Sequence, residues 1–274
     1  MTDLSLDATQ LDRYSRHVIM DEIGPDGQAA LLDASVLCVG AGGLGSPIVQ
    51  YLAAAGVGTL GIADDDVVER SNLQRQVIHR DADVGRPKVE SAAAFVEGLN
   101  PDVDVRTHET RVTRENVEPL LAEYDFVVDG SDNFRTRYLI NDACTLAGTP
   151  FAHGAVYKFE GQVTTFDAGE AGPCYRCLFP EAPGEGEVPS CAETGILGSL
   201  PGTVGTLQAT ETVKSIMDVG ERLSGRLLLF DAMDVTFEEV PVRKDPDCPV
   251  CGDDPAIESV REVEYADRCA IEAD

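Results

Sequence analysis

Lysine is scarce in this chain of 274 residues, and basic residues as a whole are greatly outnumbered by acidic ones. Aspartate and glutamate total 49 against 21 lysines and arginines, which gives a formal net charge of −28. Because such a chain repels a phosphate backbone, nucleic acid is excluded as an expected partner. The surface also repels itself in dilute salt, whereas molar salt shortens the Debye length to about 3 Å. The composition therefore predicts the protein of a salt-accumulating halophile, such as a haloarchaeon, with an ordinary acidic cytosolic protein as the alternative.

Long hydrophobic runs are also missing. No stretch approaches the roughly 20 apolar residues that a membrane helix requires, so a membrane protein is not expected. The segment Met1–Gln10 is acidic and polar, unlike the basic and then apolar start of a secretory signal peptide. We therefore expect a cytoplasmic protein, in which cysteine pairs indicate metal binding more readily than disulfides.

The spacing of apolar residues up to position 150 predicts strands that alternate with helices. Strands are expected near 35–39, 59–63, 103–107 and 125–129, and helices near 44–55, 88–98, 114–122 and 134–147. This alternation is typical of a doubly wound, mainly parallel, Rossmann-like α/β sheet. A helical arm over 8–32, broken at Gly24–Pro25, precedes the first strand.

The pattern changes after residue 150. Antiparallel strands are expected at 151–157, 162–167, 226–231 and 235–242, with a helix near 203–219. Between them, the charged segment 181–189 is rich in glycine and proline and is expected to be a mobile surface loop. The residues after Gly252 are acidic and are expected to be loosely ordered.

A glycine-rich segment, Gly40–Gly45, closes the first strand and opens the first helix of the alternating region. Glycines allow a tight turn and a close approach to phosphate, and a helix N-terminus offers unpaired N–H groups to an anion. Asp64 follows the second strand, where a ribose-binding acid is expected, and Asp132 follows the fourth. These residues all follow parallel strands and so belong to the edge of the sheet where ligands bind. The segment Ser71–Gln76 adds an arginine and amides, which suit a triphosphate better than a dinucleotide.

These two segments resemble the MoeB, ThiF and UbaA family, whose members are similar to ubiquitin-activating enzymes. The resemblance runs from Arg13 to Cys251 and is also carried by Arg13–Arg16, Val84–Lys88, Asp129–Asn133, Phe159–Gln162, Cys174–Cys177, Ser190–Glu193 and Asp247–Cys251. It implies ATP-dependent adenylation of the C-terminal glycine carboxylate of a ubiquitin-like or sulfur-carrier protein ending in Gly-Gly, with release of pyrophosphate. It also implies support of protein modification, molybdopterin synthesis and tRNA thiolation.

The same resemblance implies a domain organisation. Residues 1–254 are expected to form one adenylation domain, followed by the acidic tail 255–274. Within the domain we distinguish the helical arm 8–32, a nucleotide-binding half 34–150, and a region of antiparallel strands and cysteines over 151–254.

Roles for individual residues follow from the resemblance as well. Gly43 is expected to back the phosphates of ATP, Asp64 to bind the ribose, and Asp132 to lie beside the α-phosphate and Mg²⁺. The remaining nucleotide-binding residues are expected to be Ser71, Asn72, Leu73, Gln74, Arg75, Lys88 and Asn133. Arg16 is expected to reach into the neighbouring subunit of a homodimer. The alternatives are solvated surface charges at Arg75, Lys88 and Arg16, and a helix N-cap at Asp132.

Two CxxC pairs, Cys174 with Cys177 and Cys248 with Cys251, lie about 70 residues apart. Four thiolates suit a closed tetrahedral Zn²⁺ site, and with every position filled no water remains to be activated. We therefore expect structural zinc that ties the two segments together. The alternative is two vicinal redox pairs.

Cys191 follows the loop 181–189. In relatives that form thioesters, a cysteine after such a loop attacks the acyl adenylate, so Cys191 is a candidate nucleophile. A short helix suggested by Ala192–Leu197 could lower the pKa of this thiol through its N-terminus. The alternative is a free, exposed cysteine, and Cys269 is the next candidate for the acceptor.

Two other functions are considered. A glycine-rich Rossmann segment also fits an NAD-dependent dehydrogenase, but no second domain carries a plausible base for hydride transfer. An inactive scaffold is the third reading, and the presence of Arg75, Lys88, Asp132 and Cys191 in one chain argues against it.

Overall fold

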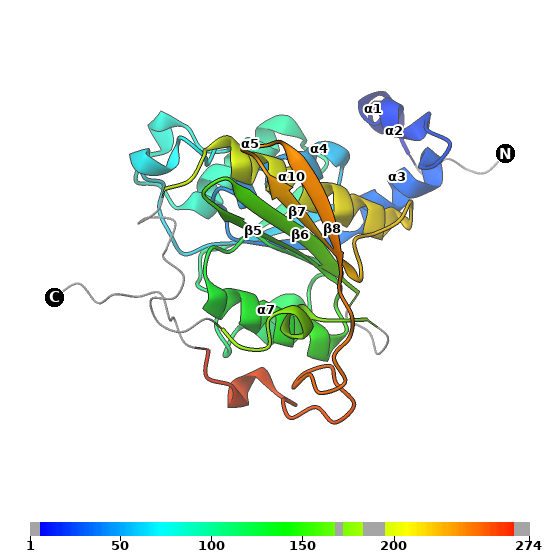
Figure 1. Cartoon of the computed structure of the whole chain (residues 1–274). Coiled ribbons are helices and arrows are strands. Elements are labelled where there is room, and N and C mark those ends of the chain that lie inside the picture. Colours follow the sequence, from blue (N-terminus) through cyan, green and yellow to red (C-terminus); the bar gives the residue numbers. More distant parts are fainter. Residues whose placement is uncertain (1–5, 168–171, 183–194, 266–274) are drawn as a thin grey trace.

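The computed structural model describes residues 6–167, 172–182 and 195–265. Its centre is one eight-stranded sheet with the order β3-β2-β1-β4-β5-β6-β7-β8 (Figure 1). The strands are β1 Ser35–Val39, β2 Thr59–Ala63, β3 Asp104–His108, β4 Phe126–Asp129, β5 Phe151–Tyr157, β6 Glu160–Phe166, β7 Arg226–Asp231 and β8 Thr236–Pro241. Neighbours from β3 to β5 pair in parallel, and those from β5 to β8 pair antiparallel. This arrangement confirms the predicted fold class.

Helices cover both faces of the sheet. The helices are α1 Ala8–Arg13, α2 Ser15–Val18, α3 Gly24–Asp33, α4 Gly45–Ala55, α5 Lys88–Leu99, α6 Val117–Leu121, α7 Phe134–Ala147, α8 Tyr175–Leu178 and α10 Ser199–Met217. Figure 1 places α4, α5 and α10 on one face and α7 on the other. Short 3₁₀ turns lie at Arg70–Asn72, Asp81–Asp83 and Val260–Glu262.

Strand β1 explains why the sequence builds two layers of helices. Its apolar residues are all buried and alternate between the two hydrophobic cores. Val36 and Cys38 pack with α4 and α10, whereas Leu37 and Val39 pack with α6 and α7. A strand buried on both faces reads as a continuous apolar run, as parallel sheets require.

The observed elements differ from the predicted ones in identifiable places. The arm over 8–32 is three helices, and Gly24–Pro25 begins α3 where a break was expected. Proline is well placed in a first helical turn because its missing N–H has no intrahelical partner there. Helix α6 covers only Val117–Leu121, and α10 begins four residues earlier than expected, at Ser199.

The acidic segment after Gly252 is packed over its described part, so the expectation of loose order is wrong for residues 253–265. Val260 is fully buried in the core formed by α6 and α7. Tyr265 donates its hydroxyl to Asp142 on α7 at 2.8 Å. An apolar anchor, a part-buried hydrogen bond and the polar contacts of Arg114 with Val263 and Glu264 hold the segment despite its polar composition.

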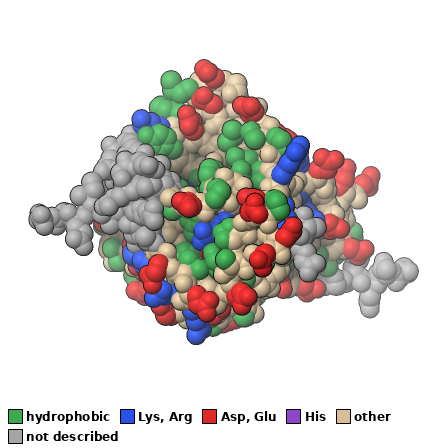
Figure 2. All heavy atoms as spheres, turned by 60° about the horizontal axis from the view of Figure 1, so that its bottom comes forward, with side chains coloured by type: hydrophobic (Ala, Val, Ile, Leu, Met, Phe, Trp, Pro, Cys, Tyr) green, Lys and Arg blue, Asp and Glu red, His purple; other side chains and the backbone are tan. Residues whose placement is uncertain are grey.

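Charge is spread over the molecule. Figure 2 shows acidic side chains scattered across one whole face, with few lysines and arginines among them. This distribution fits the high negative charge read from the sequence. Among the described helices, none combines the length and apolarity needed to cross a membrane.

Candidate functional site

A pocket of about 370 Å³ lies where the parallel strands end. Its wall is built by the segments that follow β1, β2, β3 and β4, which is the edge predicted from the strand order. The predicted site residues that line it are Gly43, Asp64, Arg75, Lys88, Asp132 and Asn133. Topology therefore gathers residues that are far apart in the chain into one ligand-sized cavity.

The glycine loop after β1 owes its shape to two close backbone approaches. Gly40 has a φ of +96°, and a Cβ there would lie 2.8 Å from the carbonyl oxygen of Gly130. A Cβ on Gly45 would lie 1.9 Å from the carbonyl oxygen of Gly40. Only glycine satisfies both positions, so the loop can pack against the end of β4 while Gly42 and Gly43 line the pocket.

Asp64 and His79 hold this loop from two sides. Asp64 accepts the N–H of Ala41 at 2.7 Å, and the Nε2 of His79 lies 2.9 Å from the Ala41 carbonyl. Burial raises the pKa of Asp64, while the charge of Lys88 and the Ala41 N–H lower it. Burial lowers the pKa of His79, which keeps its ring neutral and able to donate through Nε2. The acid expected to bind ribose is thus also a brace for the glycine loop.

Lys88 is a buried cation of the pocket wall. It is 5% exposed, and its Nζ lies 2.7 Å from Asp66 Oδ2 and 3.9 Å from Asp64 Oδ1. Its position at the start of α5 is fixed by a backbone hydrogen bond to Asp66 at 2.9 Å. The alternative of a solvated surface charge is therefore wrong for Lys88.

The segment after Asp64 contributes Arg75 to the pocket and supports it. The guanidinium lies 3.4 Å from the Ser71 carbonyl and 3.4 Å from Asn72 Oδ1. Ser71, Asn72, Leu73 and Gln74 do not themselves line the pocket. Gln74 instead packs against Gly198, at which a Cβ would lie 2.3 Å from the Gln74 carbonyl oxygen. Their contact with nucleotide stays a prediction.

Asp132 is exposed at the pocket, and the residue after it caps the N-terminus of α7. The side chain of Asn133 accepts the N–H of Thr136 at 2.9 Å and so caps α7. The alternative that Asp132 caps this helix is therefore wrong. Its carboxylate receives a long hydrogen bond of 3.4 Å from Asn133 and faces the cavity.

Sequence reasoning missed three arginines of the pocket wall, namely Arg111, Arg135 and Arg137. Arg111 pairs with Asp65 at 3.0 Å. Arg137 is buried, with its guanidinium 5.3 Å from the Phe134 ring. A usable signal existed, because these arginines follow β3 or lie in the first turns of the helix after β4. With Lys88 and Arg75 they bring five basic side chains to a wall that also holds four aspartates, at 64, 65, 66 and 132.

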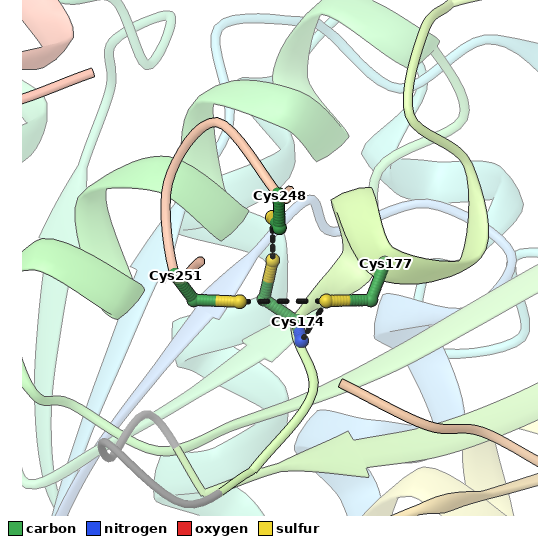
Figure 3. A group of neighbouring side chains, drawn as sticks. All are labelled: Cys174, Cys177, Cys248 and Cys251. Atoms are coloured by element: carbon green, nitrogen blue, oxygen red, sulfur yellow. Dashed lines mark hydrogen bonds between the residues drawn. The ribbon is translucent and has the colours of Figure 1, made fainter. Parts of the chain in front are cut away.

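The four predicted cysteines come together in a second site, away from the pocket (Figure 3). Their sulfurs all lie within 4.8 Å of one another, and none forms a disulfide. Cys174 Sγ is 3.5 Å from Cys248 Sγ, and Cys177 Sγ is 3.4 Å from Cys251 Sγ. This closed set of four sulfurs suits a tetrahedral metal ion. The N–H of Asp245 also points to Cys177 Sγ at 3.4 Å, an outer-shell contact typical of thiolate ligands.

Asp142 on α7 anchors the cysteine cluster. It is fully buried and accepts a bidentate pair from Arg176, at 2.8 and 2.7 Å. Arg176 lies between Cys174 and Cys177 in sequence and covers the ring of Tyr138, 4.7 Å away. The same carboxylate receives the hydroxyl of Tyr265. Through these hydrogen bonds, the charged carboxylate of Asp142 joins the first CxxC turn and the C-terminal segment to helix α7.

The other two predicted catalytic residues are Arg16 and Cys191. Arg16 is exposed on α2 and is not part of the pocket of its own chain. Cys191 lies outside the described residues, as does Cys269. The helix expected over Ala192–Leu197 is wrong for the described residues 195–197, because Ile196 forms a parallel β-bridge with Lys158.

Comparison with known proteins agrees with this geometry. The model of the ThiF family matches residues 14–250. The SAMP-activating enzyme E1 of Haloferax volcanii is 64% identical over 271 residues, which cover 99% of each chain. The sulfur carrier protein adenylyltransferase of Thermus thermophilus is 50% identical, over 96% of this chain and 97% of that one. The structure of E. coli MccB with ATP superposes with a TM-score of 0.77 at 23% identity, covering 87% of this chain and 74% of that chain. The last likeness shows the shared fold.

Proposed function

This chain belongs to the ThiF family, and on that premise we propose that it adenylates a protein carboxylate with ATP. The carboxylate is the C-terminal glycine of a ubiquitin-like or sulfur-carrier protein that ends in Gly-Gly, and pyrophosphate is released. The observation that carries the proposal is the pocket itself, in which a glycine loop, buried Lys88, half-buried Arg75 and exposed Asp132 converge.

The chemistry follows from the charges of the pocket. A carboxylate oxygen attacks the α-phosphorus of ATP, and the bond to the β,γ-pyrophosphate breaks. The triphosphate must be held straight and its charge neutralised, since such catalysis is mostly positioning and electrostatics. Lys88 and Arg75 supply the cations, and the loop Gly40–Gly45 supplies N–H groups at the N-terminus of α4. Asp132 would hold Mg²⁺, which would help to neutralise the charge of the triphosphate.

An apolar surface beside the pocket offers a place for the body of the partner protein. We call it the apolar rim; it consists of the exposed side chains of Phe159, Leu197, Met233, Val235 and Phe237. The turns that carry it are joined by hydrogen bonds from Leu197 to Lys158 and from Ala232 to Phe159. Strand β5 leads from this rim to Val156 and the neighbouring Ile196, which line the pocket. A partner seated on the rim would have its C-terminus within reach of ATP.

Arg16 supports a homodimeric arrangement. It is exposed on α2, which α3 positions through a contact between His17 and Gln28 at 2.9 Å. Figure 1 shows this arm projecting from one end of the molecule. In our proposal a second copy places its Arg16 over the pocket of the first, which would add one more cation to the phosphates.

The cysteine cluster is proposed to bind structural Zn²⁺ through Cys174, Cys177, Cys248 and Cys251. Support comes from the closed set of sulfurs and the buried anchor at Asp142. Because all four positions are thiolates, the ion would stabilise the fold and activate no water.

Cys191 is proposed to take the acyl group from the adenylate as a thioester. The resulting activated carboxylate could serve protein modification, molybdopterin synthesis and tRNA thiolation.

The test is exchange of labelled pyrophosphate into ATP in molar KCl, with and without a Gly-Gly protein. Exchange that requires the partner supports adenylation. Exchange that proceeds equally with a partner lacking its terminal glycine, or reduction of a nicotinamide cofactor by the same preparation, contradicts it.

A further inference from the structure

A buried aspartate–histidine pair behind the pocket wall has no role in the chemistry described so far. Asp129 ends β4, and His153 is its register partner on the neighbouring strand β5. Each is 1% exposed, and His153 Nδ1 lies 3.0 Å from Asp129 Oδ2. Burying a carboxylate is costly unless hydrogen bonds compensate, so this pair needs a reason.

The other oxygen of Asp129 connects the pair to the pocket. Oδ1 accepts the backbone N–H of Ser131 at 3.0 Å and its hydroxyl at 2.6 Å. Ser131 precedes Asp132 and itself lines the pocket. The backbone carbonyl of Asp129 is also fixed, by Gln208 of α10 at 2.7 Å. The loop that presents Asp132 is therefore tied to one carboxylate from below.

Electrostatics keep this carboxylate charged and the ring neutral. Burial raises the pKa of Asp129, but the contact with His153, the charge of Arg137 and the hydroxyl of Ser131 outweigh it and leave the pKa below its usual value. Burial lowers the pKa of His153, although Asp129 opposes this shift. A neutral ring must donate through Nδ1 to Asp129. Its Nε2 has no partner among the described residues, and the ring rests against Tyr175 at 4.8 Å.

We propose that Asp129 and His153 are positioning residues for adenylation, which fix Ser131 and thereby place the carboxylate of Asp132 in the pocket. This inference rests on the proposed function. His153 orients Asp129, Asp129 holds Ser131, and the geometry of Asp132 follows. Replacing His153 leaves the side chains of Lys88 and Arg75 in place, so we expect ATP binding to be retained while the rate and the Mg²⁺ requirement change.

Two substitutions of His153 separate the hydrogen bond from the packing. His153→Phe keeps a ring against Tyr175 but removes the donor to Asp129. His153→Asn is smaller, yet its Nδ2 occupies the place of Nδ1 and can donate. Loss of such outer-shell partners typically costs about 10–100-fold in metal affinity or activity. We expect His153→Phe to lower the kcat of partner-dependent pyrophosphate exchange by about that factor, with less change in the KM for ATP.

The matched control is Thr164→Val. Thr164 is the register partner of His153 on β6, and its hydroxyl donates to the Arg226 carbonyl at 2.8 Å. This substitution weakens the same part of the sheet without touching Asp129. Thr164→Val should lower the melting temperature and keep kcat. His153→Asn should recover most of the rate that is lost in His153→Phe, and its Mg²⁺ requirement should be close to that of the wild type.

Unchanged kcat and unchanged Mg²⁺ dependence in folded His153→Phe overturn the proposal, and so does equal loss in both His153 variants and Thr164→Val. If His153→Phe does not fold, Ser131→Ala, which removes the 2.6 Å contact, should raise the Mg²⁺ requirement instead. Absence of exchange in the wild type defeats the proposed function alone. The Mg²⁺ dependence of ATP affinity, measured by calorimetry on the same variants, then decides the positioning role.

Discussion

The pocket and the cysteine cluster are built in opposite ways. The pocket is lined by side chains from many loops, and its Asp132 remains exposed with one long hydrogen bond. The cluster is closed, with Cys174 and Cys248 both 2% exposed and with Asp142 behind them fully buried. A region that must receive a charged ligand keeps charges available, whereas a region that only holds the chain satisfies its groups internally. Substitutions should therefore affect rate at the first and stability at the second.

The largest effect is expected from breaking the cluster. Replacing Cys174 or Cys248 by Ser removes one metal ligand, and apparent Zn²⁺ binding energies in zinc-finger peptides are ~10–16 kcal/mol. The melting temperature in molar KCl should fall strongly, and metal analysis of fresh wild-type protein should find about one zinc per chain. A chelator should destabilise the wild type and leave the variant unchanged. Zinc-free protein with two disulfides contradicts the assignment.

The next largest effect belongs to the pocket. Asp132→Ala removes an exposed carboxylate, so the melting temperature should stay near that of the wild type. Pyrophosphate exchange should fall by about 10²–10³-fold, the usual size of losing one well-placed electrostatic group. Asp104→Ala is the control, because it removes an exposed acid from β3 far from the chemistry. Near-normal exchange in Asp132→Ala would sink the assigned role.

Lys88→Ala should have a somewhat smaller effect on the same reaction. Its nearer partner Asp66 is well exposed, so water can solvate that carboxylate when the ion pair is lost, and the pKa of the more buried Asp64 should rise further. The variant should fold normally, with a raised KM for ATP and a reduced kcat, because the triphosphate loses a buried cation. Steady-state exchange kinetics measure both constants. Wild-type values of kcat and KM would contradict a role in catalysis and leave Lys88 only the structural role of pairing with Asp66.

A modest effect on stability is expected from pH. Burial lowers the pKa of His79, His108 and His153 from the ordinary value of 6.5. Below about pH 6.5 the unfolded chain binds protons at these residues and the folded chain does not, so acid favours unfolding. The free energy of unfolding should be constant above this pH and should decrease as pH falls below it. Denaturant titrations at a series of pH values check the trend, and a stability that rises on acidification refutes it.

The smallest effect on adenylation is expected from Cys191→Ala. The adenylate requires only the nucleotide pocket, so pyrophosphate exchange should survive unchanged. A thiol-labile adduct with the Gly-Gly partner should form in the wild type and be lost in the variant, as seen on a non-reducing gel. If the variant still forms the adduct, Cys191 is not the acceptor and Cys269 is examined next.

Much of the fold could be predicted from the sequence because local patterns determine it. Strands β1, β2, β5 and β7 begin and end at the predicted residues. The packed segment 253–265 escaped prediction, because its order depends on a distant partner, Asp142, and not on its own composition. The breaks within the arm 8–32 escaped it as well, since the apolar spacing there continues across them.

Residue type and strand order predicted the place of Gly43 and Asp132 at the edge of the sheet, and the family resemblance added Lys88. The residues that hold the site residues in place were not predicted. Asp129 was seen only as part of a motif, and His153 lies in an apolar strand that gives no hint of their pairing. Such pairs depend on the register between β4 and β5, which no local pattern encodes. Arg111, Arg135 and Arg137 were not assigned to the pocket, because only the three-dimensional fold shows that they line it together.

The most direct test of the account follows an oxygen atom. The Gly-Gly partner is prepared with ¹⁸O in its terminal carboxylate and is incubated with the enzyme, ATP and Mg²⁺ in molar KCl, and an added thiol then captures the acyl group. Attack of that carboxylate on the α-phosphorus places one labelled oxygen in the AMP released, as mass spectrometry would record. We predict labelled AMP from the wild type and about 10²–10³-fold slower formation of it by Asp132→Ala. Unlabelled AMP, or ADP as the product, would contradict adenylation at this pocket.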